Sequence, residues 1–203
     1  MSEDPLMVAA MIAVAAVVLH LWWGDLRAHS GGAPHSRAFP GAVPCSRQSV
    51  LIAVAGALIL LALETGGEVV LGIADQQKTV TVLWSAYTFM AAFVEELTFR
   101  GFLVVTSRGR SWLWASVVLF SVLFALCHPF LWTWEDGRLL LHFTAKGWFS
   151  TVTVFGCSLW FYTVRFFPMN PGGSLLPCIA AHLTKNLGVF ALKAAGDFVS
   201  GWY

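Results

Sequence analysis

Two glutamates and an arginine occur together in a stretch whose composition is otherwise typical of a membrane helix. Residues 91–100 read AAFVEELTFR, and the charged members are Glu95, Glu96 and Arg100. A charged side chain at the centre of a bilayer costs about 2.5–3.5 kcal/mol on insertion scales, so such residues usually belong to functional sites. A purely structural salt bridge is the alternative, but buried ion pairs are weak stabilisers. We therefore interpret this stretch as the centre of a functional site.

The spacing of the three charges predicts different roles for the two glutamates. Glu96 and Arg100 are four residues apart, so on a helix they share a face and can form an ion pair. Glu95 is five residues from Arg100 and points about a quarter turn away from Glu96. We expect Arg100 to neutralise Glu96, which leaves Glu95 free for chemistry.

Further polar side chains occur in two other apolar segments. His128 follows Phe124 by four residues, and Asn186 follows His182 by four, so each pair shares a helix face. A single histidine or asparagine in a membrane helix often only joins helices by hydrogen bonds. Three helices that each offer such a group, one of them with the free Glu95, favour a catalytic site.

The chemistry available to these residues is hydrolysis. A carboxylate in apolar surroundings is a stronger base than in water and can take a proton from a water molecule. Imidazole and carboxamide groups can stabilise the oxyanion that forms when that water attacks a carbonyl. We expect Glu95, with His128, to activate the water, and His182 and Asn186 to stabilise the negative charge that develops on the carbonyl oxygen. The predicted reaction is cleavage of an amide bond inside or at the edge of the bilayer, with no metal and no cofactor.

The composition places this chemistry in a membrane. Of the 203 residues, 58% are hydrophobic and 11% are charged, and the mean hydropathy is +0.73, whereas a typical soluble domain is about 25% charged. A net charge of +1 gives no basic footprint, which argues against a nucleic-acid partner. The four cysteines have no CxxC spacing, so we expect neither disulfides nor zinc ligands.

Apolar periodicity predicts an all-α, polytopic transmembrane helix bundle with about six spanning helices. The expected spans cover about residues 5–23, 49–63, 79–105, 112–127, 146–167 and 174–195, with a loop over 24–48. The cluster Glu64, Thr65, Gly66 and Gly67 is expected to end the second helix, and residues 68–78 either lie along the interface or form part of a longer tilted helix. Residues 131–145 are polar and aromatic, which favours a re-entrant or interfacial connection. We expect one integral membrane domain over residues 1–203, with N-terminal helices and loops in 1–78 and a catalytic core of four helices in 79–195.

Basic residues predict an orientation. The loops after the first, third and fifth expected helices carry six arginines, and the opposite side carries four basic residues, which favours both termini outside. His128 lies near a helix end because Pro129 follows it. The site is therefore expected to lie toward the face that carries residues 129–145, which is the outer face.

Three short motifs resemble those of the CPBP family, which contains the CaaX prenyl proteases and bacteriocin-processing enzymes. Residues 95–100 (EELTFR) match EExxxR, residues 124–128 (FALCH) match FxxxH, and residues 182–186 (HLTKN) match HxxxN, in the family's order. The segment GGSLLPCIAAH over 172–182 is also similar to the family's approach to its second histidine. The resemblance covers about residues 87–189, and the two helices before it are not covered.

The resemblance implies a glutamic intramembrane protease with a CPBP-like core of four helices. It implies that Glu95 activates water beside His128. The remaining motif residues would then divide into the oxyanion pocket, formed by His182 and Asn186, and the supporting residues Glu96, Arg100 and Phe124.

The resemblance also implies partners and a location. The substrate would be a membrane-embedded or membrane-anchored protein or peptide, and the chain would be a multi-pass protein of a bacterial or archaeal inner membrane. About two helices fewer precede the motifs than in the eight-helix CaaX enzymes, which argues against prenylated CaaX substrates. Similar short bacterial members remove C-terminal sorting tails, as in the myxosortase-like group, process leader peptides or confer bacteriocin immunity.

Two alternative functions stay open on the sequence. One glutamate and two histidines could ligate zinc in a zinc-dependent membrane protease, but no HExxH is present and the candidate ligands come from three separate helices. A membrane chaperone, immunity factor or transporter could instead use the polar cluster for binding or proton relay. Inverted halves would favour a transporter, but the polar residues are confined to the later part of the chain.

Overall fold

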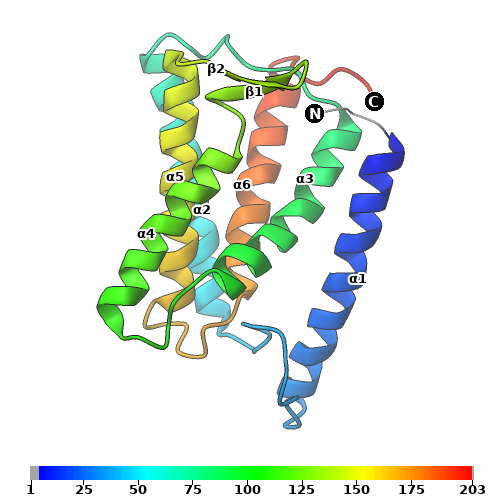
Figure 1. Cartoon of the computed structure of the whole chain (residues 1–203), viewed down its shortest axis with the longest axis vertical. Helices are drawn as coiled ribbons and strands as arrows, with labels where there is room; N and C mark the ends of the chain where they lie inside the picture. Colours follow the sequence, from blue (N-terminus) through cyan, green and yellow to red (C-terminus); the bar gives the residue numbers. More distant parts are fainter. Residues whose placement is uncertain (1–4, 203) are drawn as a thin grey trace.

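Six α-helices build the part of the protein that the computed structural model describes, residues 5–202 (Figure 1). They are α1 (Pro5–Ser30), α2 (Arg47–Val70), α3 (Val82–Glu95), α4 (Arg110–Cys127), α5 (Ala145–Phe166) and α6 (Leu176–Ala195). A π-helix, η1 (Glu96–Phe102), continues α3, and a hairpin of β1 (Trp132–Glu135) and β2 (Arg138–Leu141) joins α4 to α5. This confirms the predicted all-α membrane bundle.

The helices alternate in direction along the chain. In Figure 1 the loops after α1, η1 and α5 lie at the lower end of the bundle, and the hairpin and the C-terminal residues lie at the upper end. By length and composition, α1, α2 and α4 can each cross a membrane. The arginine-rich loops therefore share one end of the bundle, as the sequence predicts.

The first two helices are longer than predicted, because the polar and glycine residues at their ends do not stop them. α1 continues through residues 24–30, which we expected to belong to a loop, and α2 continues through Gly66 and Gly67 to Val70. A Cβ at position 67 would lie 2.7 Å from Cζ of Phe149. Gly67 thus allows α5 to approach α2 closely, and glycine is tolerated in a helix whose neighbours pack against it.

Hydroxyl side chains begin three of the helices. Ser46, Thr81 and Thr144 precede α2, α3 and α5, and each accepts a hydrogen bond from the backbone N–H three residues later, at 3.1, 3.1 and 2.9 Å. Such caps satisfy one of the unpaired N–H groups at a helix start. The Thr81 cap begins α3, the helix that carries Glu95.

α2 holds the two helices that follow the hairpin. It packs on α6 and α5, and ion pairs join Glu64 to Lys185 of α6 and Glu68 to Lys146 of α5. A Cβ at Gly188 would lie 2.2 Å from the Leu61 side chain, so α2 and α6 are in close contact. α1 packs instead on α3.

Residues 132–141 form a β-hairpin, so the connection predicted over residues 131–145 contains strands. Trp132 pairs with Leu141 and Glu135 with Arg138. Asp136 and Gly137 both have positive φ, 50° and 73°, as two-residue hairpin turns that match the strand twist require. Asp-Gly is a sequence typical of such a turn, although we predicted no turn here.

Candidate active site

The candidate site lies where α3 becomes η1, between Glu95 and Glu96. The wider turn is visible in the backbone bond from Leu103 N–H to the carbonyl of Thr98, five residues earlier, at 2.8 Å. The Tyr162 hydroxyl of α5 lies 2.7 Å from the carbonyl oxygen of Phe99 and 3.0 Å from that of Leu103. Single π-helical turns occur most often at functional sites.

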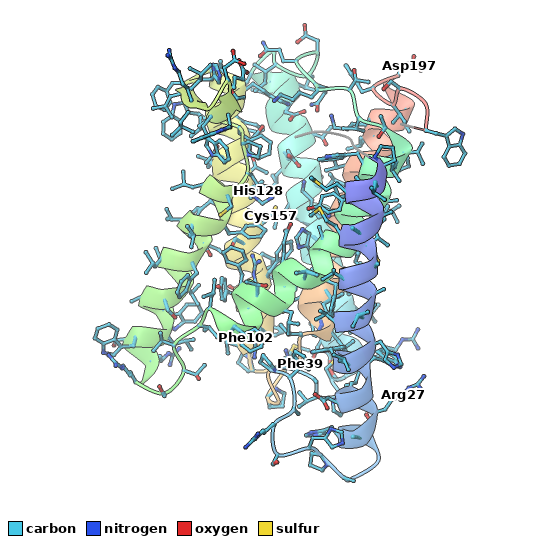
Figure 2. All side chains as sticks on the ribbon, turned by 45° about the vertical axis from the view of Figure 1, so that its right-hand side comes forward. Arg27, Phe39, Phe102, His128, Cys157 and Asp197 are labelled. Carbon is cyan, nitrogen blue, oxygen red and sulfur yellow. The ribbon has the colours of Figure 1, made fainter. Side chains whose placement is uncertain are left out.

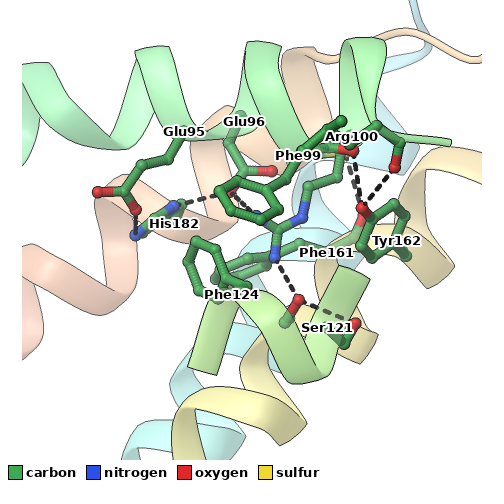
Figure 3. Close-up of polar contacts among 12 residues, drawn as sticks. Glu95, Glu96, Phe99, Arg100, Ser121, Phe124, Phe161, Tyr162 and His182 are labelled. Atoms are coloured by element: carbon green, nitrogen blue, oxygen red, sulfur yellow. Dashed lines mark hydrogen bonds and ion pairs between the residues drawn. The ribbon is translucent and has the colours of Figure 1, made fainter. Parts of the chain in front are cut away.

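The expected ion pair between Glu96 and Arg100 is present and fully buried (Figure 3). Oε1 of Glu96 lies 3.2 Å from an Arg100 guanidinium nitrogen, and neither side chain is exposed. Arg100 donates to the hydroxyl of Ser158 at 2.7 Å, and Ser158 donates to Ser121 at 2.9 Å. The Phe124 ring lies 4.3 Å from the guanidinium carbon, within the range of a cation–π contact. Arg100 is therefore held by a carboxylate, a hydroxyl chain and an aromatic face.

His182 of α6 lies between the two glutamates (Figure 3). Its Nδ1 is 2.7 Å from Oε1 of Glu96, and its Nε2 is 3.8 Å from Oε2 of Glu95. Because the ion-paired Glu96 carboxylate can only accept, Nδ1 carries the hydrogen of this bond. The ring also stacks on Phe161, with centroids 4.9 Å apart. This imidazole is thus fixed in plane and tautomer, and Nε2 faces Glu95.

Glu95 differs from its neighbour in exposure and in pairing. A third of its side chain is exposed, and no hydrogen bond to its carboxylate is present among residues 5–202. The separation from His182 is too long for a direct hydrogen bond, and one water molecule can contact both groups. Glu95 is the carboxylate of the pair that is free to act as a base.

His128 caps α4 and does not bond directly to either glutamate. Its Nδ1 lies 2.8 Å from the carbonyl oxygen of Phe124, which must accept, so Nδ1 carries the hydrogen. Nε2 is left without a hydrogen-bond partner in the described part of the chain. The ring packs against Phe124 at 4.8 Å, and His128 lies close enough to Glu95 and His182 to interact with them electrostatically. Figure 2 shows it at the end of α4 that faces the bundle.

Asn186 lies one turn beyond His182 on α6 and has a different partner. Its amide donates to the backbone carbonyl of Thr88 in α3 at 3.1 Å. The structure therefore brings Glu95, Glu96 and His182 together. His128 and Asn186 lie around them and make their hydrogen bonds to backbone carbonyls instead. Each of the latter two has its orientation fixed by a backbone carbonyl.

Sequence reasoning missed four residues that support the site. They are Ser121 of α4 and Ser158, Phe161 and Tyr162 of α5. A spacing signal was present, because Ser121 precedes Phe124 by three residues and His128 by seven, which places all three on one helix face. Ser158 likewise precedes Phe161 and Tyr162 by three and four residues.

Within residues 5–202, no group of three or more His, Cys, Asp or Glu side chains is arranged to hold a metal ion. All four cysteines are free thiols.

The chain matches a known protein family. The family model described as type II CAAX prenyl endopeptidase, Rce1-like, matches residues 77–188, which is more than half of the chain and contains every candidate site residue. No curated protein and no solved structure matches the chain.

Proposed function

The chain belongs to the Rce1-like family of type II CAAX prenyl endopeptidases, and from this membership we propose that it cleaves a membrane-associated protein with water activated by Glu95. Family membership makes the chain a membrane protease, as the three motifs predicted. The catalytic type and the residue roles are our proposal.

The observation that carries the proposal is the contrast between two adjacent carboxylates. Glu96 is fully buried and is neutralised by Arg100, whereas Glu95 is partly exposed and faces Nε2 of His182 at 3.8 Å. A general base must reach its proton directly or through one water. A water molecule that contacts both Glu95 and His182 meets this requirement.

In the proposed reaction, Glu95 takes a proton from this water while the water oxygen bonds to the carbonyl carbon of the substrate. Nε2 of His128, which has no hydrogen-bond partner among the described residues, accepts the second hydrogen and orients the water. When the tetrahedral intermediate collapses, the C–N bond breaks and protonated Glu95 gives its proton to the leaving nitrogen. The products are an amine and a carboxylic acid, which loses its proton to water on release, and Glu95 returns to its ionised form.

His182 and Asn186 stabilise the oxyanion in this proposal. Glu96 accepts the Nδ1 hydrogen of His182 and so fixes the orientation of the ring; when the ring carries a hydrogen on both nitrogens, its Nε2–H can donate to the oxyanion. Asn186 uses one amide hydrogen to bond Thr88 and has a second available. A carboxylate that orients an imidazole in this way is a general device of hydrolases.

We further propose that all six helices cross the inner membrane of a bacterial or archaeal cell as one domain. α5 and α6 have 22 and 20 residues, which is enough for a hydrocarbon core of about 30 Å. Their charged residues Arg165 and Lys185 are buried inside the bundle, as charges in membrane helices generally are.

Glu95→Ala tests the proposed function. We expect cleavage to stop while insertion and folding persist, and the matched control is Glu135→Ala, an exposed glutamate in the hairpin. The measurement compares membrane and secreted peptides from cells with the intact chain and with each variant. Unchanged processing in Glu95→Ala would end the assignment. Activity lost to a chelator and restored by zinc would favour the zinc-dependent alternative.

A further inference from the structure

A groove between α1 and α3 has Glu95 in its lining. Its volume is about 360 Å³, and its walls include Met7, Met11 and Val14 of α1 and Tyr87, Met90 and Glu95 of α3. α1 lies outside the residues that the family model matches. One wall of this groove therefore comes from residues outside the part that the family model matches.

The groove is suited to apolar side chains of varied shape. Among residues 5–202, Tyr87 and Glu95 are the only side chains with a polar group that line it. Three of the chain's five methionines line it, and flexible, polarizable methionines are typical of surfaces that bind different apolar partners. Met7, Met11 and Val14 are exposed large hydrophobic residues, so the groove is open along α1.

The dimensions and the lack of polar groups limit what can occupy the groove. It extends over the eight-residue steps from Met7 to Ala15 and from Tyr87 to Glu95, which is about 12 Å of helix. An extended peptide there would leave its backbone groups unpaired in an apolar environment, whereas a helix satisfies them internally. A 12 Å length of helix occupies about 1,100 Å³, so the groove accommodates one face of a helix and not the whole.

We infer that this groove seats one apolar face of a helical membrane anchor of the substrate, with the anchor ending beside Glu95. The inference rests on the proposed function, since it places the scissile bond at the end of the anchor. Its argument is the continuity of the groove with the partly exposed carboxylate. α1 then selects substrates by helix-in-groove contacts, the mode in which residues on one face of a helix act as anchors.

Photo-crosslinking tests this groove without relying on cleavage. p-Benzoylphenylalanine replaces residue 11 in the groove or, as the matched control, residue 17, where Val17 is 60% exposed on α1 but does not line the groove. Both proteins carry Glu95→Gln, so that the probe stays intact. The probe is a biotinylated Leu/Ala helical peptide of about 20 residues in phosphatidylcholine vesicles, with unlabelled peptide or farnesol as competitor.

We expect the peptide to crosslink at position 11 and not at position 17, and only unlabelled peptide to compete. Equal crosslinking at both positions would mean that the peptide meets α1 only by chance within the bilayer, and this would overturn the inference. Displacement of the peptide by farnesol alone would overturn it as well. In the otherwise unaltered protein, Met11→Trp should raise KM roughly tenfold with little change in kcat, and Val17→Trp should change neither. Unchanged kinetics in Met11→Trp would also overturn it.

The two proposals can fail separately. If Glu95→Ala stops cleavage but positions 11 and 17 crosslink equally, the proposed function stands and the groove assignment falls. If crosslinking is confined to position 11 while Glu95→Ala leaves processing unchanged, the groove assignment stands and the role of Glu95 falls.

Discussion

Glu96→Gln keeps the shape of the side chain at position 96 and removes its charge. In the folded protein this carboxylate is fully buried, accepts a hydrogen bond from His182 and lies 3.2 Å from Arg100. The amide oxygen can still accept from His182, but it cannot balance the guanidinium. Arg100 would keep Ser158 and the aromatic faces around it, and its charge would be buried without a counter-ion.

The expected loss of stability is large. Breaking a buried ion pair by removing one partner costs about 3–5 kcal/mol. The cation–π contact with Phe124 is present before and after the change, so it offsets none of this loss. For a chain of this size, about 1 kcal/mol lowers Tm by about 2–4 °C. Glu96→Gln should therefore lower Tm by roughly 6–20 °C.

Thermal unfolding of the detergent-solubilised protein, followed by tryptophan fluorescence, measures this change. Glu95→Gln is the matched control, because this carboxylate is partly exposed and makes no hydrogen bond among the described residues, and its expected change is within about 0.5 kcal/mol. The double variant Glu96→Gln, Arg100→Met should recover most of the loss, since replacing both charges of a buried pair is often neutral. Equal Tm values for the two single variants, or no recovery in the double variant, would refute the ion-pair reasoning.

Two further predictions concern α5, namely its hydrogen bond to Arg100 and its packing on α2. Ser158→Ala removes the hydroxyl that accepts from Arg100 at 2.7 Å, so we expect a loss of about 1.5–3 kcal/mol in thermal unfolding, and an unchanged Tm would contradict this. Gly56→Ala would place a Cβ 2.1 Å from the Trp160 ring, and overpacking of this kind costs about 1–3 kcal/mol. Gly66→Ala in the same helix meets nothing within 4 Å and should stabilise by up to about 1 kcal/mol; the same Tm shift in both glycine variants would count against the packing argument.

The sequence was sufficient for the features that depend on spacing. The Glu96–Arg100 pair is found where four-residue spacing predicts it, although the segment is a π-helix and not the α-helix we assumed. The prediction held because residues four apart remain neighbours when the turn holds one more residue. The all-α bundle also followed from composition, since long uncharged runs can satisfy their backbone only as helices in a membrane.

The features that depend on contacts between distant elements could not be predicted. Nothing in residues 182–186 indicates that both ring nitrogens of His182 face glutamates, because this depends on how α6 packs on α3. The predicted end of α2 was wrong because Gly67 makes room for the Phe149 side chain and does not end the helix. A local glycine signal carries no information about a partner as distant in the chain as Phe149 is from Gly67.

The π-helix limits how this chain can vary in length. η1 places Glu96 and Arg100 together, and the carbonyl of Phe99 and that of Leu103, just after its end, accept from Tyr162. Deleting one residue of η1 would turn everything after it by about 100°. An insertion or deletion of a kind that surface loops absorb would therefore separate the guanidinium from its carboxylate. Insertions and deletions among related chains should therefore fall in the connections between helices, and the six residues from Glu95 to Arg100 should keep their number and spacing.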